Sequence, residues 1–155
     1  MSKIVCATRA GEGSRAVQLA AIERAREPGQ QLTFLYVIDP DSLADVDEMI
    51  REHLRSELMW MGKTLLRIAE KRASEANLPA ELIIREGSVR DEICNFVTET
   101  GAVLLLLGAP RETTANIFGD DEIENFAQYI HETTDVPVEI IRPESMLTPD
   151  IAANV

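Results

Sequence analysis

The sharpest local motif for chemistry is a pair of glycines that follows the first apolar run. Gly11 and Gly13 fit the pattern Gly-x-Gly-x-x-Ala, which Ala16 completes, between a predicted strand and a predicted helix. Asp39 ends the second apolar run, where a carboxylate binds ribose in dinucleotide-binding folds. However, Glu12 puts a negative charge inside the turn, and the chain has no room for a substrate lobe. We therefore interpret the glycines as a tight strand-to-helix turn and rank a dinucleotide enzyme last.

The remaining reactive residue types lack the spacing of a catalytic or metal site. His53 and His131 lie on predicted helices outside any metal-spaced cluster. Cys6 belongs to an apolar strand and Cys94 to a helix, which is typical of packing rather than of redox chemistry. Neither a Gly-x-Ser-x-Gly elbow nor a Walker loop is present. We expect no enzyme activity, no catalytic residue and no bound metal.

Length and charge exclude several classes of protein. The 155 residues suit one domain, and a hydrophobic fraction of 45% suffices for a core. The formal charge of -12 opposes binding to nucleic acid or to an anionic membrane. The longest apolar run, residues 102–107, is too short to cross a bilayer, and the first residues do not resemble a signal peptide. We expect a cytoplasmic, reduced protein without nucleic-acid or membrane partners.

The elements that must position any site alternate along the chain. Helical spacing is found from Ser14 to Pro28-Gly29, over 46–76 with Gly62 as a candidate interruption, over 88–101 and over 123–130. Apolar runs predict strands at 3–8, 32–38, 81–85, 103–107 and 138–142.

The order βαβαβαβαβ predicts an α/β fold with an open, mostly parallel five-stranded sheet and helices on both faces, as in Rossmann-like proteins. Residues 1–142 would form this domain, and 143–155 a tail. Run 103–107 is the most hydrophobic and is predicted to be the central strand. Ligands of such folds bind beyond the carboxyl ends of the strands, so the loops at 8–13, 39–42, 87–88 and 108–122 matter most.

Helix starts are predicted from capping residues. Ser14 and Ser88 stand where an N-cap would accept backbone N–H bonds, and Ser42 with Asp45 is spaced like a weak capping box before the long helix.

Two surfaces are candidates for protein contacts. Consecutive apolar residues Met59, Trp60 and Met61 on the long helix cannot all face one core, so they favour either a partner protein or an unusually wide buried stripe. The last strand would leave an exposed sheet edge, which a two-fold dimer would cover.

The ordered set of motifs resembles the universal stress protein family over residues 3–142. The motifs are Ile4-Val-Cys-Ala-Thr8, Leu35-Tyr-Val-Ile-Asp39, Arg85-Glu-Gly-Ser88 before Ile93, Leu105-Leu-Leu-Gly108 and Val136-Pro-Val138. The resemblance implies the adenine nucleotide alpha hydrolase-like fold and dimers joined through the last strand. It also implies one of two branches, of which one binds ATP and the other does not. The positions equivalent to the family's ATP site are Thr8, Arg9, Val37, Gly108, Arg111 and Asn125.

This chain departs from the ATP-binding pattern of that family, which has an Asp after the first strand and a loop Gly-x2-Gly-x9-Gly-[Ser/Thr]. Arg9 replaces the Asp and Arg111 the second glycine, and the last pair falls on Asp121-Glu122 or on Glu124-Asn125, depending on the register. Acidic residues crowd the place where phosphates would lie, although the two arginines could bind a smaller anion or pair with those acids. The resemblance therefore implies a non-catalytic, homodimeric stress-response or regulatory module without strong ATP binding and without a cofactor. The alternative is a family member that binds ATP or AMP through a degenerate phosphate loop.

Overall fold

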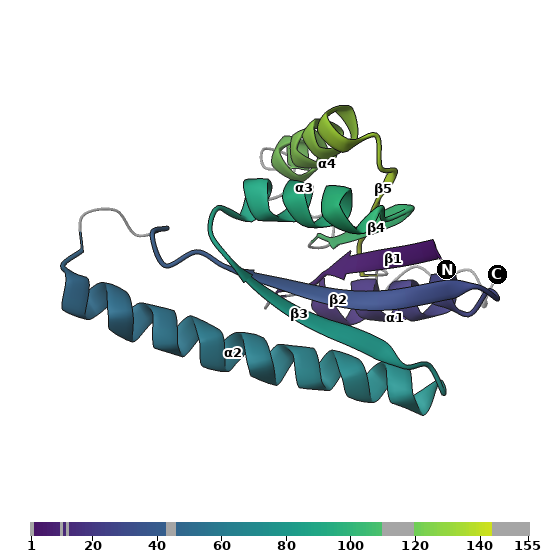
Figure 1. Cartoon of the computed structure of the whole chain (residues 1–155), viewed down its shortest axis with the longest axis horizontal. Helices are drawn as coiled ribbons and strands as arrows, with labels where there is room; N and C mark the ends of the chain where they lie inside the picture. Colours follow the sequence, from purple (N-terminus) through teal and green to yellow (C-terminus); the bar gives the residue numbers. More distant parts are fainter. Residues whose placement is uncertain (1, 10, 12, 43–45, 110–119, 144–155) are drawn as a thin grey trace, which may run out of the picture.

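Five parallel strands form one open sheet in the order β3-β2-β1-β4-β5 (Figure 1). This computed structural model describes residues 2–9, 11, 13–42, 46–109 and 120–143. The strands are β1 (Ser2–Ala7), β2 (Gln30–Ile38), β3 (Ala80–Glu86), β4 (Leu104–Gly108) and β5 (Val138–Ile141). The fold class predicted from the alternation of apolar runs and helical stripes is confirmed. The predicted tail lies outside the described residues except for its first residue.

Within the described residues, four helices cover the two faces of the sheet (Figure 1). They are α1 (Ser14–Ala25), α2 (Glu48–Glu75), α3 (Val89–Thr100) and α4 (Asp120–Thr134). One hydrophobic core lies between the sheet and α1 with α2, and a second lies between the sheet and α3 with α4. In β1, Ile4 and Cys6 belong to the first core and Val5 to the second, so the strand is buried on both faces. This double burial explains why the strands read as continuous apolar runs.

The predicted central strand is wrong. β1 occupies the middle of the sheet, and β4, the most hydrophobic run, lies beside it. A strand that helices cover on both faces is apolar, and both β1 and β4 are covered in this way. The apolar character of a strand therefore does not show which of the two lies at the centre of the sheet.

The predicted starts of two helices also need correction. α2 begins at Glu48, not near residue 42, because the carboxylate of Asp47 accepts a hydrogen bond from the backbone N–H of Ile50 at 3.0 Å. Asp45, the second residue of the predicted capping box, lies outside the described residues. Ser14 is the first helical residue of α1 rather than its cap, which is Gly13. Ser88 is the N-cap of α3, although its side chain makes no capping hydrogen bond.

α2 is continuous over 28 residues, so the candidate interruption at Gly62 is also wrong. Its first turns extend past the carboxyl ends of the strands (Figure 1). Two exposed ion pairs tie this part of the helix to loop and strand: Arg51 contacts Asp41, and Arg55 contacts Glu86, both at 2.7 Å. Among the described residues, no helix is both long enough and apolar enough to span a membrane.

Both cysteines are free and buried, as expected for packing residues. Burial raises the pKa of the Cys6 thiol and is the main cause of the raised pKa of Cys94. At neutral pH the two thiols therefore stay protonated.

Candidate functional site

A small cavity lies at the carboxyl ends of β1, β2 and β4, where they meet α3 and α4. Its volume is about 120 Å³. β1 stands at the point where the winding of the sheet reverses, because the chain proceeds from β1 to β2 on one side and returns to β4 on the other. Open α/β sheets bind ligands at this point. The lining residues are Ala7, Thr8, Arg9, Leu35, Val37, Val89, Ile93, Leu107, Gly108, Ile123 and Phe126.

The structure brings four of the six predicted site residues together. Thr8, Arg9, Val37 and Gly108 all line the cavity, although they come from three different strands and the segments that follow them. Asn125 is exposed on α4 and does not line the cavity. Arg111 lies outside the described residues.

The helical part of the lining was not among the predicted site residues. Val89 and Ile93 of α3, with Ile123 and Phe126 of α4, close the cavity from above the sheet. All four lie in the first two turns of their helices. A helix that follows a parallel strand starts at the carboxyl edge of the sheet, where ligands bind. The place of these four residues at the starts of their helices could therefore have identified them as lining residues.

The hydroxyl of Thr8 is held by a chain of buried polar groups. Gln18 of α1, only 1% exposed, donates from Nε2 to Oγ1 of Thr8 at 2.8 Å. The carbonyl oxygen of the same amide accepts a hydrogen bond from the guanidinium of Arg72 on α2. Because a guanidinium can only donate, Arg72 fixes which end of the amide faces Thr8. The hydroxyl of Thr8 therefore accepts from Gln18 and keeps its own proton available for a ligand.

The glycine turn packs tightly against the end of β4. A Cβ atom at Gly13 would lie 2.6 Å from the carbonyl oxygen of Ala109, and one at Gly108 would lie 3.1 Å from the carbonyl oxygen of Gly13. Gly11 has φ +125, which side chains rarely tolerate. The space that a pyrophosphate would need at Gly13 is thus occupied by backbone, which supports the tight-turn interpretation over a dinucleotide site.

The charges around the cavity are of both signs. Arg9 is the one charged side chain among the described lining residues, and within the described part of the chain no carboxylate lies within 4.0 Å of its guanidinium. Glu122 and Glu124 are exposed on the first turns of α4. Asp120 and Asp121 precede them in the sequence. The described first turns of α4 therefore carry two exposed carboxylates near a cavity with one cation.

The histidines occupy the ordinary surface positions expected for them. His53 is exposed, 4.0 Å from Glu57 on the next turn of α2. His131 places Nδ1 3.0 Å from the carbonyl oxygen of Val136, at the end of α4. Over the described ranges, no group of three His, Cys, Asp or Glu residues is arranged to hold a metal ion.

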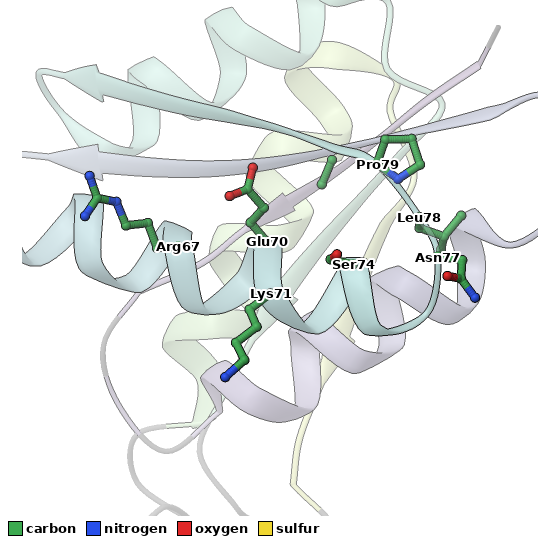
Figure 2. Close-up of a pocket in the computed structure, with 8 residues that line it drawn as sticks. Arg67, Glu70, Lys71, Ser74, Asn77, Leu78 and Pro79 are labelled. Atoms are coloured by element: carbon green, nitrogen blue, oxygen red, sulfur yellow. The ribbon is translucent and has the colours of Figure 1, made fainter.

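A larger hollow, of about 580 Å³, lies between the end of α2 and the start of β3. Figure 2 shows its walls: Arg67, Glu70, Lys71 and Ser74 on the helix, and Asn77, Leu78 and Pro79 on the turn. In this view Glu70 is directed toward the neighbouring strand, whereas Lys71 points to the opposite side of the helix. Since the charged groups do not converge on one point, this hollow lacks the arrangement that would fix a small ligand.

Comparison with known proteins agrees with this fold. The model of the universal stress protein family matches residues 1–142. Universal stress protein YxiE of Bacillus subtilis is 30% identical over 98 residues, which cover 58% of this chain and 66% of that protein, just under two thirds.

Solved structures of similar fold cover nearly the whole chain. Universal stress protein UspA from Lactobacillus plantarum superposes with a TM-score of 0.72 at 20% identity, over 91% of this chain and 97% of its own. A family protein from Arabidopsis thaliana, solved with AMP bound, gives 0.68 at 18% identity over 99% of both chains.

Proposed function

This chain belongs to the universal stress protein family, and we propose that it is a non-catalytic regulatory module that does not bind Mg-ATP strongly. The observation that carries the proposal is the acidic start of α4. Ile123 and Phe126 line the cavity, so the first turn of this helix stands at the rim. That turn contains Asp120, Asp121 and Glu122.

The acidic turn removes the attraction that a helix start normally offers to phosphates. A helix N-terminus binds anions through free N–H groups and the positive end of the helix dipole. The carboxylates of Glu122 and Glu124, exposed near that end, offset its positive potential, and each one repels a triphosphate. The described lining supports a non-catalytic role as well, because it contains one hydroxyl and one guanidinium but no histidine, cysteine or carboxylate.

A second candidate function is binding of AMP or ATP by the same cavity. The apolar walls suit the flat face of a base, the Thr8 hydroxyl can donate one hydrogen bond, and Arg9 offers one positive charge. We choose AMP as the ligand of this candidate function because the relative from Arabidopsis thaliana was solved with AMP bound. One cation suits a monophosphate better than a triphosphate.

Calorimetric titration of the purified protein with ATP, ADP and AMP, with and without Mg²⁺, tests the proposal. We expect no saturable heat with Mg-ATP at millimolar concentration. The double variant Glu122→Gln/Glu124→Gln, which removes two exposed negative charges, should tighten ATP binding by about tenfold, enough to give saturable heat at millimolar ATP. Glu132→Gln, an exposed change far along the same helix, is the matched control and should give no saturable heat, like the native protein.

Saturable heat with AMP but not with ATP would favour the second candidate function, with AMP as the ligand. Stoichiometric ATP released from the purified protein by denaturation, and identified by mass spectrometry, would reject the proposal. An equal response of the double variant and the Glu132→Gln control would show that the acids of α4 do not govern affinity.

The proposed module is a homodimer joined through β5. β5 is an edge strand of four half-buried residues. The backbone carbonyls of Pro137 and Ile141 accept hydrogen bonds from Leu105 and Ala109, at 3.0 and 2.9 Å. In a parallel ladder alternate residues face the same neighbour, so the N–H groups of Val138 and Ile140 point away from β4, toward the open edge. An exposed row of such groups is a template for a second chain.

Ile140→Pro should convert the dimer to a monomer. The substitution removes an outward N–H without removing a bond to β4, and edge strands tolerate proline. Ile140→Ala is the matched control, because it removes the packing of the same side chain but keeps the N–H. Sedimentation equilibrium should give twice the chain mass for the native protein and the control, and the single chain mass for the proline variant. A native protein that sediments as a monomer would refute the dimer.

A further inference from the structure

The outer face of α2 carries a line of exposed side chains that the proposed function does not use. Met49, His53, Trp60, Arg67 and Lys71 follow one another at spacings of four, seven, seven and four residues, so they lie along one side of the helix. This is the side opposite Gly62, Leu66, Ala69 and Ala73, which are buried against the sheet. We call these five residues the outer line of α2.

The first half of the outer line holds two exposed apolar side chains, Met49 and Trp60, with His53 between them. Met49 is 83% exposed and Trp60, the one tryptophan of the chain, is 67% exposed. Met61 and Ile68 extend the apolar surface on one flank, at 39% and 42% exposure. Met59 does not belong to this surface, because it packs against the first core. The contact surface predicted from residues 59–61 is therefore reduced to Trp60 and Met61.

The second half of the outer line is basic, in a protein with a net charge of -12. Arg67 and Lys71 of the line, and Lys63 beside it, are exposed, and in the described part of the chain no carboxylate lies within 4.0 Å of any of them. They are four residues apart, which places like charges on successive turns and destabilises the helix. Lys71 lines the hollow beside β3, and Figure 2 shows its side chain on the side of the helix away from the neighbouring strands.

We propose that the outer line of α2 docks an acidic segment of another protein, which covers Trp60 with an apolar side chain. Charge complementarity favours this partner, because the carboxylates of an acidic segment would pair with the three cations. The acidic remainder of this protein would repel the same carboxylates elsewhere on its surface. Tryptophan and arginine, both exposed here, are enriched among the residues that contribute most to protein–protein binding. An anionic bilayer would face more of this acidic molecule than a narrow segment does, so the net charge disfavours the bilayer more strongly.

Trp60 makes the proposal directly measurable, because all tryptophan emission comes from the docking surface. The probe is a synthetic helical peptide of Glu and Leu, with Leu at every third and fourth position, and its counterpart with Lys in place of Glu. We expect a saturable blue shift of the emission with the Glu peptide, weakened by added salt. Arg67→Glu/Lys71→Glu should lower the affinity by about tenfold or more.

Arg15→Glu/Arg26→Glu is the matched control, because it makes the same change of net charge at exposed positions of α1 and its C-cap. Circular dichroism of each variant establishes that the fold is intact. An emission maximum that does not move at millimolar Glu peptide would overturn the proposal, as would equal responses to the Glu and Lys peptides. A loss of affinity in the α1 control equal to that in the α2 variant would also reject it. A blue shift caused by vesicles of anionic lipid, or by raising the protein concentration alone, would replace the proposed partner with a membrane or with a second copy of the chain.

Discussion

Replacing Gly13 with alanine should destabilise the protein by about 3 kcal/mol. The new methyl group would lie 2.6 Å from the carbonyl oxygen of Ala109 and 2.8 Å from its amide nitrogen. Both are backbone atoms of the segment after β4, so neither can rotate away. The backbone of Gly13 itself, at φ -84 and ψ -5, is acceptable for alanine. The cost therefore comes from the contact, and relief requires the glycine turn and the end of β4 to separate.

Urea unfolding followed by circular dichroism measures this effect. Ser14→Ala, one residue further on, is the control, because that residue already lies within α1 and Gly13 is the N-cap. We expect the control to change the free energy of unfolding by less than about 0.5 kcal/mol. If Gly13→Ala were as stable as Ser14→Ala, the close approach of the two backbones would be disproved.

Gly62→Ala should cost about 2 kcal/mol, although alanine favours a helix interior by about 1 kcal/mol over glycine. The substitution destabilises the protein on balance because of Tyr36, whose ring atoms Cδ1 and Cε1 would lie 2.7 and 3.0 Å from the added methyl group. The Tyr36 side chain belongs to the first core and is 6% exposed. It therefore has little free space into which to turn, and α2 would have to move off the sheet.

A double-mutant cycle isolates this contact. Tyr36→Leu removes the ring, so adding Gly62→Ala in that background should no longer destabilise and should recover the helix-propensity gain. Thermal or urea unfolding of the four proteins gives the coupling free energy, expected at about 2 kcal/mol or more in favour of the double variant. Strictly additive effects would mean that the ring of Tyr36 does not restrict position 62.

The parts of the fold that depend on local pattern could be predicted from the sequence. Continuous apolar runs mark the strands and a spacing of three to four residues marks the helices, and Gly101 ends α3 with φ 63, as its position after the helical stripe indicated. The parts that depend on distant packing could not. Gly62 looked like a break because its partner, Tyr36, lies on another element. Likewise, Asp47 and Ser42 are comparable caps in sequence, and only the path of the loop decides between them.

The candidate site divides in the same way. Thr8, Arg9, Val37 and Gly108 follow strand ends, and parallel strands bring their carboxyl ends to one edge, so their meeting was predictable. Gln18 was not identified as part of the site. Its link to Thr8 crosses from a helix to a strand, and Arg72, which orients it, is 54 residues away in the chain. No local pattern signals such a chain of polar groups.

The projecting end of α2 can open without disturbing the rest of the molecule. Beyond the strand ends its turns are secured by the ion pairs of Arg51 and Arg55, both in contact with solvent, and not by a hydrophobic core. Rising ionic strength weakens such anchors, while the packed stretch around Leu66 and Ala69 is insensitive to it. We therefore expect α2 to have two stabilities, with a rigid stretch packed on the sheet from Leu58 onward and first turns that fray more easily.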